Sequence, residues 1–288
     1  MWSRIRNRIR DRPVFTFFVV TYLLSWTAWS PLVFSDWWAT LSPLLVAEEQ
    51  RTVVLIVVGG FGPLVAAGLV TRVIGDSVRD WARAVLRWRV PLRYWIFAFL
   101  FPAVGVFFAS AVHILVFGGA FETESTDVLV LYPVLLVQVF LIGGGNEELG
   151  WRGFALPRLQ RRYSALVASL VIGVGWFGWH LPLFLVSGSS QVGVPVYYYG
   201  VAVVALSVVF TWLYNQTDGS VLLTMVLHAS VNTGGILYLA GGGAALQNDL
   251  PNALYAAVFL IAALAFIAAY GSERLADEEV TTKQSGSG

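Results

Sequence analysis

Eight apolar runs divide the chain, and polar or charged stretches separate them. The runs are Val14–Phe34, Thr52–Val70, Tyr94–Phe117, Val128–Ile142, Ala165–Val186, Val194–Leu213, Val221–Ala240 and Leu250–Tyr270. A helix that crosses the hydrocarbon core of a bilayer needs about 20 consecutive apolar residues. All the runs except Val128–Ile142, the shortest, come close to this length. The pattern predicts an all-α, polytopic integral membrane protein with about eight transmembrane helices.

The basic residues fall almost entirely on one side of these runs. If the N-terminus is cytoplasmic and successive runs alternate in direction, every Lys and Arg except Arg51 lies in a cytoplasmic segment. Lys and Arg concentrate in the cytoplasmic loops of membrane proteins. The distribution therefore predicts that both the N-terminus and the C-terminus are cytoplasmic.

The composition supports one membrane domain. Hydrophobic residues make up 57% of the chain and charged residues 12%, which is more apolar than soluble domains require. We expect a basic cytoplasmic segment over residues 1–12, a single helical transmembrane domain over residues 13–270 and a disordered cytoplasmic tail over residues 271–288. The chain has no cysteine, which excludes disulfides, thiolate nucleophiles and Cys-ligated metals. We expect membrane lipid, and no nucleic acid, as a partner.

Two adjacent glutamates follow the glycine run Gly143–Gly145 at the end of the fourth apolar run. Arg152 lies four residues after Glu148, so a helix would place these two side chains on one face as an ion pair. Glu147 would point about 100° away and keep a free carboxylate. Burial raises the pKa of a free carboxyl group, which suits a general base that works near neutral pH. Taken alone, however, such a pair is more often an exposed cap or a solvated turn.

Two of the three histidines of the chain lie in apolar runs together with other polar side chains or aromatic residues. His180 follows the aromatic residue Trp176 by one helical turn. His228 precedes Asn232 by one turn, so the imidazole and the carboxamide share a helix face. An intramembrane histidine can simply form an interhelical hydrogen bond, and we assign that structural role to His113, which lacks such neighbours.

In order along the chain, three motifs resemble those of a known family. They are Glu-Glu-x-x-x-Arg, aromatic-x-x-x-His and His-x-x-x-Asn, each in a separate predicted membrane helix. The set resembles the CPBP family, which comprises CAAX prenyl endopeptidases of the Rce1 type and bacteriocin-processing-like intramembrane proteases, and is also called the Abi family. The resemblance covers roughly residues 128–239, and Trp176 stands where the family usually has Phe. It implies an endopeptidase that cuts a peptide bond within or beside the membrane.

The resemblance also implies roles for individual residues. Glu147 and His180 would activate a water molecule, and His228 with Asn232 would stabilise the oxyanion of the tetrahedral intermediate. The supporting residues Glu148 and Arg152 match the second Glu and the Arg of the first motif. Peptide hydrolysis requires these elements: an activated water, donors for the oxyanion and a proton for the leaving amine.

A metal-dependent mechanism is the alternative. Glu147, His180 and His228 could ligate Zn²⁺, and the family is often described as metalloproteases. The chain has no His-x-x-x-His pair on one helix, and Asn is an unusual zinc ligand. We therefore favour a metal-free mechanism that depends on glutamate, with no certain cofactor.

With straight helices, His180 and Glu147 would lie at different depths in the membrane, although the proposed chemistry requires them together. A straight helix that begins at Ser164 would place His180 about 24 Å above its cytoplasmic end, whereas Glu147 would lie near that end. We expect either that Trp151–Leu170 enters the membrane slantwise or that Gly143–Gly145 bends the fourth helix.

Two other classes of function remain open at this point. Buried Glu, His and Asn also occur in proton- or ion-coupled secondary transporters, although we find no internal repeat. A non-catalytic scaffold or immunity-type relative could retain the same motifs. The sequence does not identify the peptide or protein substrate, whether that substrate is prenylated, or the oligomeric state. Arg outnumbers Lys 17 to 1, a bias typical of GC-rich prokaryotic genomes, so we expect a multi-pass protein of a prokaryotic cell membrane.

Overall fold

A computed structural model describes residues 2–34 and 48–277, and within them the regular structure is helical apart from one isolated bridge between Glu122 and Ala240. The α-helices are α1 Trp2–Asp11, α2 Pro13–Val33, α4 Glu48–Gly60, α5 Gly62–Ile74, α6 Val78–Arg83, α7 Leu92–Phe117, α8 Thr126–Val130, α9 Tyr132–Ile142, α10 Glu148–Gly150, α11 Leu156–Leu159, α12 Ala165–His180, α13 Val196–Gln216, α14 Val221–Gly234 and α15 Asp249–Tyr270. Shorter 3-10 or π turns are η1 Ala84–Leu86, η2 Gly145–Glu147, η3 Trp151–Ala155, η4 Leu181–Leu185, η5 Gly235–Leu237 and η6 Gly243–Gln247. The prediction of an all-α protein is confirmed.

Within the described part of the chain, six helical stretches are long and apolar enough to cross a membrane. They are Pro13–Val33, Gln50–Ile74, Leu92–Phe117, Ala165–Leu185, Val196–Gln216 and Asp249–Tyr270. Val221–Leu237 is a shorter apolar helical stretch and makes a seventh candidate. The chain is therefore a polytopic membrane protein.

The fourth apolar run differs from the prediction. A continuous span over Val128–Ile142 is wrong, because this stretch forms two short helices, α8 and α9, that meet at Leu131. The chain then breaks at Gly143 and continues through η2, α10, η3 and α11 to Leu159. Glycine lacks a Cβ atom and favours such a break, and Gly144 has a φ of 139° that other residues rarely adopt.

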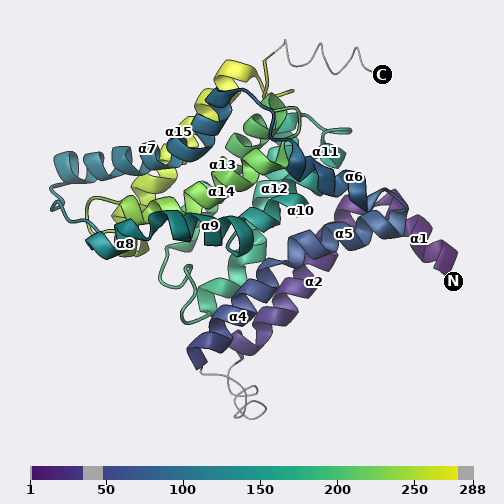
Figure 1. Ribbon diagram of the computed structural model, residues 1–288, viewed down its shortest axis with the longest axis horizontal. Helices are drawn as coiled ribbons and strands as arrows, with labels where there is room; N and C mark the ends of the chain where they lie inside the picture. Colours follow the sequence, from purple (N-terminus) through teal and green to yellow (C-terminus); the bar gives the residue numbers. More distant parts are fainter. Residues whose placement is uncertain (1, 35–47, 278–288) are drawn as a thin grey trace.

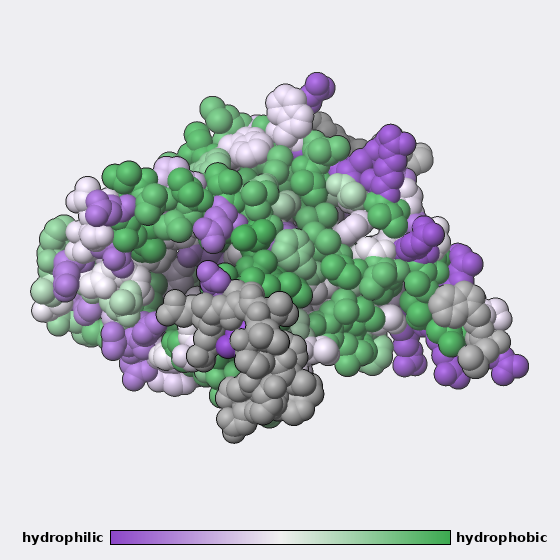
Figure 2. Space-filling view, turned by 60° about the horizontal axis from the view of Figure 1, so that its bottom comes forward, coloured by the Kyte–Doolittle hydropathy of each residue, from purple (hydrophilic) through white to green (hydrophobic). Residues whose placement is uncertain are grey.

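The long helices surround the central helix α13, which packs against α12 on one side and α15 on another (Figure 1). Helix α14 packs against α7 and α9, and α2 packs against α4 and α5. Most side chains of α13 are buried, whereas α2, α7 and α15 expose many large apolar side chains. In Figure 2 apolar surface covers the middle of the visible face, and hydrophilic groups gather at its left and right ends. This is the distribution expected of a protein whose outer helices face lipid.

The prediction of a disordered tail over residues 271–288 is wrong for residues 271–277. Leu275 is fully buried, and the carbonyls of Ser272 and Glu273 accept hydrogen bonds from the first backbone amides of α12. The Asn215 side chain also donates to the Arg274 carbonyl. Residues 271–277 therefore pack against the helical domain, while the rest of the tail lies outside the described residues.

Candidate functional site

The glutamate motif lies on the broken segment between α9 and α11. Its first turn, η2, is fixed by the buried Asn146, whose side chain accepts a hydrogen bond from the Gly144 amide and donates one to the Gly60 carbonyl at the end of α4. Further along, the Cα of Gly150 lies so close to Pro63 of α5 that a Cβ atom would approach its carbonyl oxygen to 2.6 Å. The break thus holds the motif tightly against the interior of the bundle.

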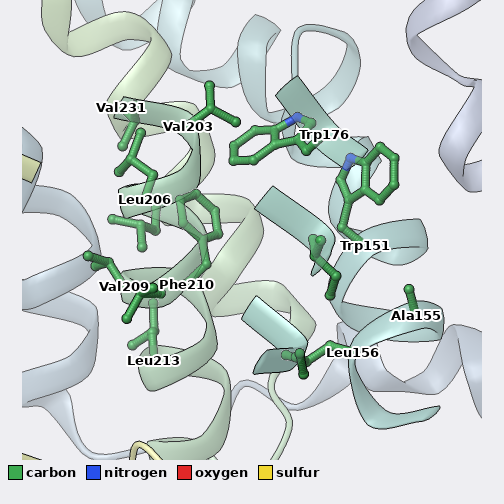
Figure 3. Packing of buried hydrophobic residues seen from close by; sticks show 14 of the residues in the cluster. Trp151, Ala155, Leu156, Trp176, Val203, Leu206, Val209, Phe210, Leu213 and Val231 are labelled. Atoms are coloured by element: carbon green, nitrogen blue, oxygen red, sulfur yellow. The ribbon is translucent and has the colours of Figure 1, made fainter. Parts of the chain in front are cut away.

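Glu147 is buried, and two indole groups hold one of its carboxylate oxygens. Trp176 Nε1 donates to Oε2 over 2.9 Å and Trp151 Nε1 donates to the same atom over 3.2 Å. Figure 3 shows the two indole nitrogens facing each other. The other oxygen, Oε1, has no hydrogen-bond donor among the described residues, and the residue retains 6% exposure.

Glu148 forms a fully buried ion pair, as its spacing from Arg152 predicts. Arg152 Nη1 lies 3.0 Å from Glu148 Oε1, and both side chains are 0% exposed. The guanidinium also donates to the Ser207 hydroxyl over 3.2 Å and lies over the ring of Phe210 at 4.3 Å. A buried charge is tolerated only when it is paired and hydrogen-bonded, and Arg152 meets both conditions with partners from α10 and α13.

His228 and Asn232 converge on the glycine break, as their spacing on one helix face predicts. His228 Nδ1 lies 2.8 Å from Glu148 Oε1, and Asn232 Nδ2 donates to the Gly143 carbonyl over 3.0 Å. A Cβ atom on Gly144 would lie 2.5 Å from His228 Nε2 and 2.7 Å from Asn232 Nδ2. Only glycine fits at this position, so the His and Asn side chains lie directly against the backbone of the broken segment.

His180 is the last residue of α12, and one of its ring nitrogens forms a hydrogen bond. Its Nδ1 lies 2.9 Å from the Trp176 carbonyl, an acceptor, so Nδ1 carries the proton and Nε2 keeps its lone pair when the ring is neutral. The ring packs edge to face against Trp179 and Tyr199, with centroids 4.7 and 5.5 Å apart. This packing fixes the orientation of the ring and leaves Nε2 as its basic atom.

Trp176 contacts all three candidate ionisable residues. Its indole nitrogen binds Glu147, and its ring lies 5.9 Å from the His180 ring and 5.1 Å from the His228 ring, measured between centroids. The structure therefore gathers one acid and two imidazoles, from the broken segment, α12 and α14, around a single indole.

The break in the fourth apolar segment brings Glu147 to the same depth as the side chains of α12. Trp176 is the twelfth residue of α12, about 16 Å from the start of that helix at 1.5 Å per residue. Because Glu147 binds Trp176, it lies well inside the bundle, and the break at Gly143–Gly145 agrees with the bend that we expected there. The segment after it continues to Arg158, which pairs with Asp76 just beyond α5.

His113 lies apart from this group and contacts Tyr238. The Tyr238 hydroxyl lies 3.1 Å from His113 Nδ1, and the ring centroids are 6.0 Å apart. This interhelical contact joins α7 to the segment after α14, in agreement with the structural role expected of it.

The described residues do not fit a catalytic zinc site. Such a site uses three protein ligands and keeps a fourth position for water. No group of three His, Asp or Glu side chains lies close enough to hold a metal ion in the part of the chain that the structure describes.

The sequence did not indicate several residues of the site. Trp151 donates a hydrogen bond to Glu147, the Ser207 hydroxyl accepts one from Arg152, and Tyr199 packs against His180. Trp151 lies one turn after Glu147, a spacing that could have marked it. Ser207 and Tyr199 lie on α13, and their contacts depend on helix packing that no local pattern encodes.

Comparison with known proteins agrees with the position of this site. Residues 128–234 match the family described as type II CAAX prenyl endopeptidase Rce1-like. The chain is also similar to "CAAX prenyl protease 2" of Methanococcus maripaludis, at 34% identity over 122 residues. That match covers 40% of this chain and 43% of the relative's length. All the candidate site residues, from Glu147 to Asn232, fall inside the region that matches the family.

Proposed function

We propose that this protein is an intramembrane endopeptidase, because residues 128–234 match the Rce1-like family of type II CAAX prenyl endopeptidases. It would hydrolyse a peptide bond in a substrate that reaches the bundle from the membrane. The observation that carries the proposal is the convergence of Glu147, His180 and His228 around Trp176. An acid with one free oxygen beside two imidazoles suits the activation of water and the binding of an oxyanion.

In the proposed mechanism, Glu147 is the general base. Oε1 accepts a proton from water while the two indoles hold Oε2, and His180 Nε2 accepts a hydrogen bond from the same water and orients it. The hydroxide attacks the scissile carbonyl carbon, and the C–N bond breaks. The proton held by Glu147 then passes to the leaving amine, so that the products are a carboxylic acid and an amine, and the proton of the acid passes to the amine in water.

The oxyanion site is assigned to His228 and Asn232. Glu148 accepts the hydrogen bond from His228 Nδ1 and is the counter-ion when both ring nitrogens carry protons. His228 Nε2 and Asn232 Nδ2 both lie against Gly144, where two donors can meet one oxygen. Arg152 acts as a positioning residue, because it holds Glu148 in place through a buried ion pair.

The topology is also a proposal. Residues 126–159 would make the fourth crossing as a bent path rather than a straight helix, and Val221–Leu237 the seventh crossing. With these two, the chain crosses the membrane about eight times, and both termini lie on the side of the basic residues, which is the cytoplasm by the positive-inside rule. Glu147 then lies near the middle of its crossing.

The proposal is tested with purified protein reconstituted into vesicles. Farnesylated and unprenylated peptides of the same sequence, ending in Cys and three further residues, are incubated with the protein, and mass spectrometry identifies the products. We expect cleavage that releases a C-terminal fragment from the prenylated peptide, with the Glu147→Ala variant inactive. Uptake of peptide coupled to protons, without cleavage, would instead support a carrier, and the absence of both would support a non-catalytic relative.

A further inference from the structure

A basic cavity lies beside the junction of α1 and α2, far from the proposed catalytic residues. Its volume is about 570 Å³, and it extends from the first turns of α2 to the connection between α11 and α12. Five arginines line it: Arg10, Arg12, Arg158, Arg161 and Arg162. We call it the arginine cavity.

The two acidic residues that line the arginine cavity do not balance the positive charge of its five arginines. Asp11 and Asp76 also line it, and Asp76 pairs with Arg158 over 2.7 Å. The other four arginines form no ion pair with a described acidic residue. Arginine clusters of this kind bind phosphate groups through bidentate hydrogen bonds.

The second observation is an apolar groove that begins where the arginine cavity ends. This groove, which we call the α2 groove, has a volume of about 630 Å³ and follows α2 from Phe18 to Ser30. Phe18 lines both the groove and the cavity. The two hollows therefore adjoin at Phe18, one of them charged and the other apolar.

The polar atoms along the groove are already satisfied. Tyr22 donates its hydroxyl to the Gly175 carbonyl over 2.6 Å, and Trp26 donates its indole N–H to the Trp179 carbonyl over 3.0 Å. Gly175 and Gly178 let the Phe18 and Tyr22 rings approach α12 closely. What remains exposed along the groove is chiefly aromatic and aliphatic surface, which suits a hydrocarbon chain.

The inner part of the groove lies at the depth of one leaflet. Phe18 and Leu23 lie five and ten residues after Pro13, the first residue of α2, or about 8 and 15 Å along the helix, and one leaflet contributes about half of a 30 Å hydrocarbon core. The arginine cavity lies on the side of the predicted cytoplasmic segments. Basic pockets on that side of membrane proteins bind the head groups of anionic lipids.

We propose that the arginine cavity and the α2 groove together bind one anionic phospholipid of the inner leaflet, with its phosphate among the arginines and an acyl chain along α2. The inference goes beyond the proposed peptidase activity and does not depend on it. A free phosphate ion would occupy only the charged end, and a neutral lipid only the apolar end. The adjacency of the two hollows at Phe18 favours a ligand that has both parts.

The test measures lipid binding to the purified full-length protein by native mass spectrometry. Three probes are compared: dioleoyl phosphatidylglycerol, dioleoyl phosphatidylcholine and inorganic phosphate. We expect phosphatidylglycerol to bind at one site at least ten-fold more tightly than phosphatidylcholine, and inorganic phosphate to give no discrete adduct. Each arginine near an anionic head group contributes about a five-fold factor in affinity. The double variant Arg161→Gln/Arg162→Gln should therefore weaken phosphatidylglycerol binding about 25-fold and leave phosphatidylcholine binding unchanged.

Two further variants complete the test. Arg79→Gln/Arg89→Gln removes the same charge from exposed positions of the same predicted side and should not change binding. Val19→Trp fills the groove and should weaken both lipids at least five-fold. Equal binding of the two lipids, equal losses in both double variants, or binding of phosphate alone at the same site would overturn the proposal. So would Val19→Trp if it leaves lipid binding intact but blocks cleavage of a prenylated peptide, because the groove would then hold the substrate.

Discussion

Trp176 donates its indole N–H to Glu147 over 2.9 Å, which joins the middle of α12 to a glycine-rich break in the fourth apolar segment. Both donors to Glu147 bind Oε2, so the carboxylate presents its other oxygen in a fixed direction. A general base held in this way needs little reorganisation before it accepts a proton. The contact also sets the depth of Glu147 in the bundle.

Trp176→Phe tests this contact. Phenylalanine keeps an aromatic ring beside both histidines but removes one hydrogen bond to a charged oxygen, which costs about 1.5–3 kcal/mol. We expect kcat/KM for peptide cleavage to fall about 10- to 100-fold. Trp212→Phe is the matched control, because Trp212 is a buried indole without a hydrogen-bond partner for its nitrogen. Similar losses of activity in both variants would show that ring packing, rather than the donor, matters.

Asn232→Ala tests the oxyanion site. Loss of one oxyanion donor lowers kcat about 10²–10³-fold in other hydrolases, and we expect a similar fall here with a small change in KM. Asn248→Ala is the control, because Asn248 is also exposed and also donates to a backbone carbonyl. A variant of Asn232 that changes only KM would assign this side chain to substrate binding.

Arg152→Met tests the buried ion pair. The substitution leaves Glu148 buried with His228 as its only partner, and removal of one member of a buried pair costs about 3–5 kcal/mol. We expect a large fall in the melting temperature in detergent, and a smaller fall for Arg152→Met combined with Glu148→Gln. The exposed pair of Arg83 and Asp80 offers the control, since Arg83→Gln should change stability by less than about 0.5 kcal/mol. Equal effects of Arg152→Met and Arg83→Gln would contradict the account.

The sequence predicted those parts of the site that depend on local spacing. The pairing of Glu148 with Arg152 follows from a separation of one helical turn, as does the shared face of His228 and Asn232. The all-helical membrane fold follows from the apolar runs. These features are fixed by the periodicity of a single helix.

The sequence did not predict contacts between segments that lie far apart along the chain. The bonds from Trp176 to Glu147 and from His228 to Glu148 join residues 29 and 80 positions apart, and only the packing of the helices brings them together. A bend at Gly143–Gly145 was one of two alternatives that the sequence left open, because hydropathy does not register the positive φ of Gly144. The depth of Glu147 follows from that break.

The most direct test of the central claim is the cleavage rate of Glu147→Gln beside that of the wild type, with saturating prenylated peptide in the same vesicles. Glutamine can still accept hydrogen bonds from both indoles, but it cannot serve as the base. The account predicts a fall in kcat of at least about 10²-fold, with peptide binding and the melting temperature retained. A variant that cleaves the peptide within a few-fold of the wild-type rate would contradict it.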